Sequence, residues 1–167
     1  MIHRYHFSKF GTGSILSRNS KVIGANNISI GNNVFISENG WLNANRENSS
    51  ANPSLSIGDN TYIGRMCQIN AWMDVDIGKN VLIADRVFIS DADHQFKDKA
   101  KPIIEQGDKF IGSIKICDGS WLGIGCVILP GVIIGKNAIV AANSVVTKNV
   151  PDHSIASGVP AKIIKQL

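Results

Sequence analysis

Residues 116–149 read ICDGSWLGIGCVILPGVIIGKNAIVAANSVVTKN, and an aliphatic residue returns at every sixth position. The same six-residue frame recurs in three earlier blocks. Its members are Ile116, Leu122, Ile128, Ile134, Val140 and Val146 in this stretch, and Ile30, Ile36, Ile57, Ile63, Ile69, Ile77, Ile83 and Ile89 before it. Because six is even, the inward and outward alternation of a strand stays in phase from one repeat to the next.

Asn or Gly follows most of these frame residues at a distance of three positions. Of the fourteen frame positions, seven are followed by Asn and three by Gly. Both residue types tolerate positive φ, so the pattern predicts a tight corner at one fixed point of each repeat. Only short strands fit between such corners, and a fixed period of this kind predicts a β-solenoid.

Three hexads would form one triangular coil of about eighteen residues, with one hexad on each side. Successive coils joined by a main-chain ladder would stack about 4.8 Å apart, so about five coils would give a prism roughly 25 Å long. We therefore expect an all-β fold whose inward aliphatic residues form one continuous core.

The chain is expected to form a single domain over residues 1–167, with residues 1–20 as a lead-in before the regular frame. Polar residues 43–55 should bulge outward. Residues 91–113 should form an extruded loop, because a solenoid gains nothing from a long excursion unless it binds or covers something. Residues 160–167 are predicted to form a short helix on the last coil, since Pro160 suits a helix start and Ile163, Ile164 and Leu167 would share a face.

Composition excludes several classes of protein. Hydrophobic residues make up 44% of the chain, but no apolar run is long enough to span a membrane, and the start has no apolar signal segment, so we expect a cytoplasmic protein. The net charge of +4 includes no Lys/Arg run typical of nucleic-acid binding. The excess of basic residues lies late in the chain, which suits a small anionic ligand better than a nucleic-acid duplex. The cysteines show no metal-ligand spacing, and Cys67 and Cys126 fall at a small-residue packing position.

Four motifs resemble one known family when they occur in this order: Ile89-Ser-Asp-Ala-Asp-His94, Trp121-Leu-Gly123, Val146-Thr-Lys148-Asn-Val-Pro151 and Gly158-Val-Pro-Ala-Lys162. They are similar to those of the hexapeptide-repeat, left-handed β-helix acyltransferases that use acetyl-CoA. The likeness is closest to galactoside and maltose acetyltransferases and to sugar O-acetyltransferases of surface-polysaccharide clusters. It implies a left-handed coil, a homotrimer with active sites between subunits, and no metal.

His94 matches the catalytic histidine of that family. A sugar hydroxyl attacks a thioester at neutral pH only if a base removes its proton, and imidazole titrates close enough to neutrality to do so. No nucleophile motif indicates an acyl-enzyme, so direct transfer is expected. Asp91 or Asp93 could orient His94. Asn70 matches an acceptor-contacting Asn of the family, with a turn Asn as the structural alternative, and Asp74 is a weaker acceptor candidate.

The resemblance also implies a coenzyme site. Trp121, Ile124, Ala141 and Ala142 match positions along the pantetheine arm. Thr147, Lys148, Lys162 and Lys165 match positions at the adenine nucleotide end. The family often has Arg at the last two, and Lys keeps the charge but loses the bidentate phosphate contact.

Four functions compete on these residues. The first is O-acetylation of a sugar or glycan precursor, and the second is N-acylation of an amino sugar or an antibiotic. The third, a β-helix carbonic anhydrase, needs three zinc-binding histidines, whereas only His94 lies within the repeats. The fourth is a non-catalytic scaffold, which would leave the late motifs unexplained.

Overall fold

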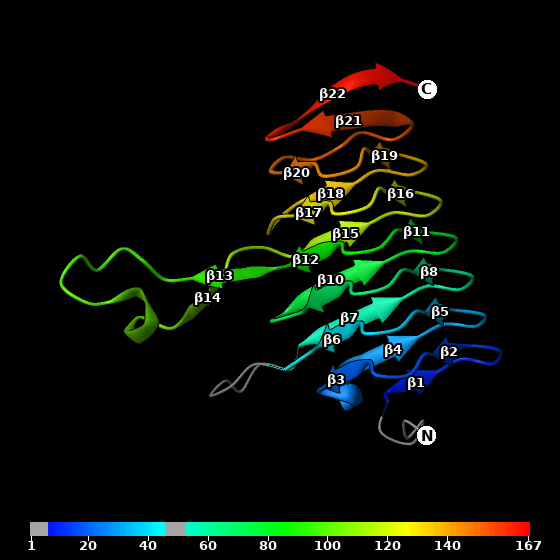
Figure 1. Ribbon diagram of the computed structural model, residues 1–167, viewed down its shortest axis with the longest axis horizontal. Helices are drawn as coiled ribbons and strands as arrows, with labels where there is room; N and C mark the ends of the chain where they lie inside the picture. The colour runs from blue at the N-terminus through cyan, green and yellow to red at the C-terminus, as the bar shows by residue number, and fades with distance from the viewer. Residues whose placement is uncertain (1–6, 46–52) are drawn as a thin grey trace.

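The computed structural model describes residues 7–45 and 53–167, which form a stack of three-sided coils (Figure 1). Each coil gives one strand to each of three parallel sheets, called A, B and C here. Sheet A contains β1 (Lys9–Phe10), β4 (Ile28–Ile30), β7 (Ser54–Ile57), β10 (Asp74–Ile77), β15 (Ile114–Ile116) and β18 (Ile133–Ile134). Sheet B contains β2 (Ile15–Leu16), β5 (Phe35–Ile36), β8 (Tyr62–Ile63), β11 (Leu82–Ile83), β16 (Trp121–Leu122), β19 (Ile139–Val140), β21 (Ser154–Gly158) and β22 (Ala161–Gln166). Sheet C contains β3 (Lys21–Ile23), β6 (Trp41–Asn43), β9 (Gln68–Asn70), β12 (Phe88–Ser90), β17 (Val127–Ile128) and β20 (Val145–Val146).

The core lies along the axis of the stack and is made by the six-residue frame. All fourteen frame aliphatics are buried, none more than 2% exposed. The register places like residues above one another, as in the pairing of Ile57 with Ile77 and of Ile77 with Ile116. Each fully buried Ile or Leu contributes about 1.5–3 kcal/mol of burial free energy, so this column dominates the stability. The predicted solenoid core is confirmed.

The corners follow the predicted backbone conformation. Nine of the ten Asn and Gly residues at the corner position have φ between 51° and 79°: Asn33, Asn39, Asn60, Asn80, Asn137, Asn143, Gly119, Gly125 and Gly131. Asn149 is the exception; its side chain accepts a hydrogen bond of 2.8 Å from the Ile133 N–H. Met66 and Arg86 adopt the same left-handed conformation, which the surrounding coils impose on residues that do not favour it.

The expected five coils and the lead-in over residues 1–20 were wrong. Strands β1 to β3 form a complete coil that begins at Lys9, so the sheets hold six three-strand coils, with β21 beginning a further one. Residues 1–6 lie outside the described residues. Phe10, Leu16 and Val22 are spaced six residues apart, pair with Ile30, Ile36 and Leu42, and pack against the core. Eight residues rather than six separate Val22 from Ile30, so this coil is out of phase with the frame.

The predicted C-terminal helix was also wrong. Residues 161–166 form strand β22, which pairs antiparallel with β21 at the end of sheet B. An isolated helix of eight residues is marginal in water. The edge of β21, by contrast, offers a row of unpaired backbone groups, and the β-branched Ile163 and Ile164 suit a strand. The segment therefore covers the last coil as a hairpin.

Between β12 and β15 the chain leaves the stack as the arm that projects from the middle of the molecule (Figure 1). Strands β13 (Ala92–His94) and β14 (Asp108–Phe110) pair antiparallel along this arm. A short 3₁₀ helix, η3 (Ile103–Glu105), lies towards the tip, and another, η2 (Ala25–Asn27), lies between β3 and β4. The polar bulge predicted at residues 43–55 falls mostly on residues 46–52, which lie outside the described residues.

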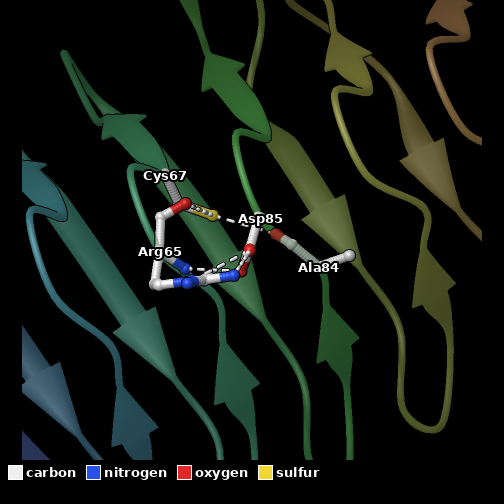
Figure 2. A network of polar contacts seen from close by, with 4 residues as sticks. All are labelled: Arg65, Cys67, Ala84 and Asp85. Atoms are coloured by element: carbon white, nitrogen blue, oxygen red, sulfur yellow. Dashed lines mark hydrogen bonds and ion pairs between the residues drawn. The ribbon is translucent and has the colours of Figure 1, made fainter.

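Figure 2 shows one corner between sheets B and C, where neighbouring coils are joined by side chains. Arg65 and Asp85 form an ion pair of 2.7 Å, but Arg65 is largely exposed, so the pair adds only about 0–1 kcal/mol. The buried Cys67 thiol lies 3.1 Å from the Ala84 carbonyl oxygen and can donate a hydrogen bond to it. Burial raises the pKa of Cys67 to about 11, so it stays a thiol that fills the corner. Cys67 is a packing residue, as predicted.

Candidate active site

A cavity of about 530 Å³ lies where the arm leaves the outer face of sheet C. Its wall on the stack comes from β6, β9 and β12, and its wall on the arm from β13 and β14. Asn70, His94 and Asp108 are among the residues that line it. A second cavity of about 460 Å³ lies on sheet A, where Lys79 pairs with Asp59 and Lys115 with Asp76. Lys9 and Lys136 also line that cavity, and no histidine does.

His94 is the last residue of β13, and its side chain is 73% exposed. The antiparallel register places it directly opposite Asp108 on β14. The Nδ1 atom of His94 contacts the Asp108 carboxylate. A carboxylate at Nδ1 selects the tautomer that carries its proton there, which leaves Nε2 with a free lone pair. The arm therefore presents an oriented imidazole that can accept a proton at Nε2.

Neither acid expected from the sequence occupies this position. The Asp93 carboxylate accepts a 2.8 Å hydrogen bond from the backbone N–H of His94. Asp91 is fully buried, and its carboxylate accepts hydrogen bonds from the backbone N–H groups of residues 72, 73 and 74 at 2.7–2.8 Å. Burial raises the pKa of Asp91, although the three N–H groups act in the opposite direction. Asp108, fourteen positions after His94, was not predicted. The one signal for it in the sequence was the short strand pattern at the end of the loop.

The two acceptor candidates are separated by the structure. Asn70, on β9, lines the cavity. Its backbone carbonyl oxygen accepts a hydrogen bond of 3.4 Å from the backbone N–H of Asp91. Asp74 is exposed at the start of β10 and does not line the cavity. Its link to the site is indirect, because its backbone N–H donates a hydrogen bond to the carboxylate of Asp91.

The residues matched to the coenzyme occupy three other places in the chain. Trp121 lies on the outer face of sheet B, and Ile124, Ala141 and Ala142 lie in the turns that lead from sheet B to sheet C. Thr147 and Lys148 follow β20, and Lys162 and Lys165 lie on β22. None of these eight residues lines the His94 cavity. One copy of the chain therefore does not bring the coenzyme set and the imidazole together.

Among residues 7–45 and 53–167, no three His, Cys, Asp or Glu side chains are grouped so that they could hold a metal ion. In the same residues, no helix has the length and apolarity needed to cross a bilayer. His3 and His6 lie outside the described residues.

Residues 113–148 match the protein family described as bacterial transferase hexapeptide (six repeats). The chain is similar to the galactoside O-acetyltransferase of Escherichia coli (strain K12), with 35% identity over 72% of this chain and 62% of that protein. It spans between 37% and 62% of the length of the curated relatives that it matches first.

Solved structures share the fold over nearly the whole chain. A hexapeptide-repeat acetyltransferase from Vibrio cholerae O1 biovar eltor, in complex with acetyl coenzyme A, is 26% identical with a TM-score of 0.71, over 98% of this chain and 73% of that one. An N-acyltransferase from Bacillus cereus, in complex with dTDP and coenzyme A, is 23% identical with a TM-score of 0.84, over 98% and 86% of the two chains. The second likeness concerns the fold alone. The architecture is thus that of the left-handed β-helix acyltransferases, as expected.

Proposed function

The chain belongs to the hexapeptide-repeat transferases, and from this premise we propose that it is an acetyl-CoA-dependent O-acetyltransferase that modifies a hydroxyl of a sugar or glycan precursor. The observation that carries the proposal is the contact between His94 and Asp108 at the mouth of a cavity that also contains Asn70. An oriented base beside a polar cavity is what transfer to a hydroxyl requires.

The chemistry follows from this arrangement. The acceptor hydroxyl oxygen attacks the thioester carbonyl carbon while its proton moves to Nε2 of His94. The tetrahedral intermediate then breaks its C–S bond, and the departing sulfur takes the proton back from His94, which yields an acetyl ester and free coenzyme A. Asp108 stabilises the imidazolium in between, and Asn70 holds the acceptor.

We assign the pantetheine arm to Trp121, Ile124, Ala141 and Ala142, and the nucleotide end to Thr147, Lys148, Lys162 and Lys165. The four residues of the first group lie on one outer face and its corner, next to each other in successive coils. None of these eight residues lines the His94 cavity within one chain, which supports a site completed by a second copy. We propose, in line with the family resemblance, that the active site is shared between subunits of a homotrimer.

The outer face of sheet B supports this assembly. An apolar column runs along it, because Ile15 pairs with Phe35, Phe35 with Tyr62, Tyr62 with Leu82, and Leu82 with Trp121. These five side chains are 37–52% exposed, and the rings of Phe35 and Tyr62 stack at 5.6 Å. Water-exposed apolar columns of this length mark association surfaces. We infer that two further copies cover it.

Leu82→Glu should convert the trimer into monomers, because it places a charge in the middle of this column. Size-exclusion chromatography with light scattering measures the mass directly. Ile133→Glu is the matched control: Ile133 is equally exposed but lies on sheet A, and this variant should stay trimeric. A monomeric parent protein, or a Leu82→Glu variant that keeps the parent mass, would refute the assembly.

The function itself is tested by two measurements on the full chain. Calorimetric titration should show binding of acetyl-CoA. Thiol release should then appear with methyl hexopyranosides as acceptors, and mass spectrometry should find an acetyl ester on the sugar. Glucosamine and galactosamine test the competing chemistry. Absence of acetyl-CoA binding, or transfer to the amines only, would contradict the proposal.

A further inference from the structure

Three polar atoms at the His94 cavity are buried without a hydrogen-bond partner among the described residues. They are the indole nitrogen of Trp41, Nε1, and the carboxamide oxygens, Oδ1, of Asn43 and Asn70. All three residues line the same cavity. Buried polar atoms are normally paired, and one that is left unpaired costs about 1–3 kcal/mol. Three such atoms in one wall indicate that a bound ligand supplies the missing hydrogen-bond partners.

The repeat itself places these side chains together. Trp41 and Asn43 are two residues apart on β6, so both point out of the stack. The register then sets Asn70 of β9 directly beside Asn43, and Gln68 beside Trp41. Strand β12 continues both rows with Phe88 and Ser90. The wall is therefore a two-row lattice with fixed spacing, on rigid strands rather than on a loop.

The unpaired atoms define the chemistry of a ligand. An indole N–H can only donate, and two carboxamide oxygens can only accept. A hydroxyl does both, so two neighbouring hydroxyl groups satisfy all three atoms. Every side chain of this wall is uncharged, whereas Asp93, His94 and Asp108 lie on the arm across the cavity. An ammonium group would find no carboxylate on the wall. The nearest cation is the Lys21 ammonium, which is already placed over the Trp41 ring, 4.4 Å from its centroid.

We propose that Trp41 and Asn43 join Asn70 to form the subsite that selects the acceptor, an uncharged hexopyranose ring held through two neighbouring hydroxyls. The aromatic face of Phe88 suits the C–H face of such a ring, whereas one face of the Trp41 ring is covered by Lys21. The Asn χ2 torsions are soft, so the carboxamides can turn towards the ligand when it binds. This inference rests on the proposed function, since it names the substrate class of the same site.

The test compares three variants by acceptor kinetics and thermal unfolding. Trp41→Phe removes the N–H and keeps a ring, and Asn43→Leu removes the oxygen at similar size. Each should raise KM for the best methyl hexopyranoside about tenfold or more, with kcat changed less than about threefold. Asn26→Leu, at an exposed Asn outside the cavity, is the control and should leave both constants unchanged.

Thermal unfolding separates this role from a structural one. Asn43→Leu deletes a polar atom that has no partner and keeps the side-chain size, so its melting temperature should stay the same or rise. Trp41→Phe also loses ring volume and weakens the Lys21 contact, so a small fall is expected there. A lower melting temperature with an unchanged KM would show that the two side chains support the fold, and would overturn the inference. So would a parent protein that accepts every single-deoxy methyl hexopyranoside as well as the full sugar.

Binding without acetyl-CoA keeps this inference distinct from the proposed function. Saturation-transfer NMR with methyl β-D-galactopyranoside, and with the glucoside and mannoside, should detect binding that Trp41→Phe weakens. If this holds while no acetyl transfer occurs, the subsite stands and the proposed function fails. If transfer to hydroxyls occurs but neither variant changes KM or binding, the function stands and the subsite fails. If none of the three glycosides binds, the subsite is refuted.

Discussion

His94→Asn lowers the rate of acetyl transfer by at least about a hundredfold, because a carboxamide cannot take the proton of the attacking hydroxyl near neutral pH. Acetyl-CoA affinity should not change, since the residues assigned to the coenzyme do not line the His94 cavity. Asp108→Asn should give a smaller loss of kcat than His94→Asn does: the imidazole remains, but its Nδ1 no longer contacts a carboxylate.

Thiol-release kinetics and calorimetric titration measure the two effects separately. His153→Asn is the matched control, because His153 is exposed on the turn before β21, has φ of 54°, and does not line the cavity. Asn tolerates that backbone conformation. A His94→Asn protein with more than about a tenth of the parent kcat would exclude general-base catalysis by this residue.

Asp91→Ala should destabilise the protein by about 3 kcal/mol or more, because three backbone N–H groups lose their buried carboxylate acceptor together. For a domain of this size that corresponds to a fall in melting temperature of roughly 6–12 °C. The transfer rate should fall as well. The backbone carbonyl of Asp91 also accepts from the N–H groups of Ile111 and Gly112, so this residue ties both ends of the arm to the stack.

Thermal unfolding followed by circular dichroism tests the first effect, and kcat at a temperature where the variant stays folded tests the second. Asp98→Ala is the control, because Asp98 is an exposed acid further along the same arm and its loss should cost less than about 0.5 kcal/mol. An Asp91→Ala protein with the parent melting temperature would show that the carboxylate does not anchor the arm.

Some residues of the site could be proposed from the sequence, whereas others became visible only in the structure. His94 and Asn70 could be proposed from the sequence because they match positions of the family that the neighbouring motifs resemble. Asp108 could not, since its contact with His94 depends on the register of a hairpin inside an irregular segment. The polar rows of Trp41 and Asn43 likewise become visible only when the coils are stacked.

The sequence by itself determined the coil, its corners and its core. Those features repeat with a short period, and each is set by local chemistry: alternation fixes which side chains point inward, and Asn or Gly permits the positive φ of the corners. The tertiary structure decided that residues 161–166 form a strand, that Asp91 is a buried anchor and that Asp108 orients the imidazole. These outcomes depend on which edge, amide or side chain is available nearby in space, and no local pattern specifies such a partner.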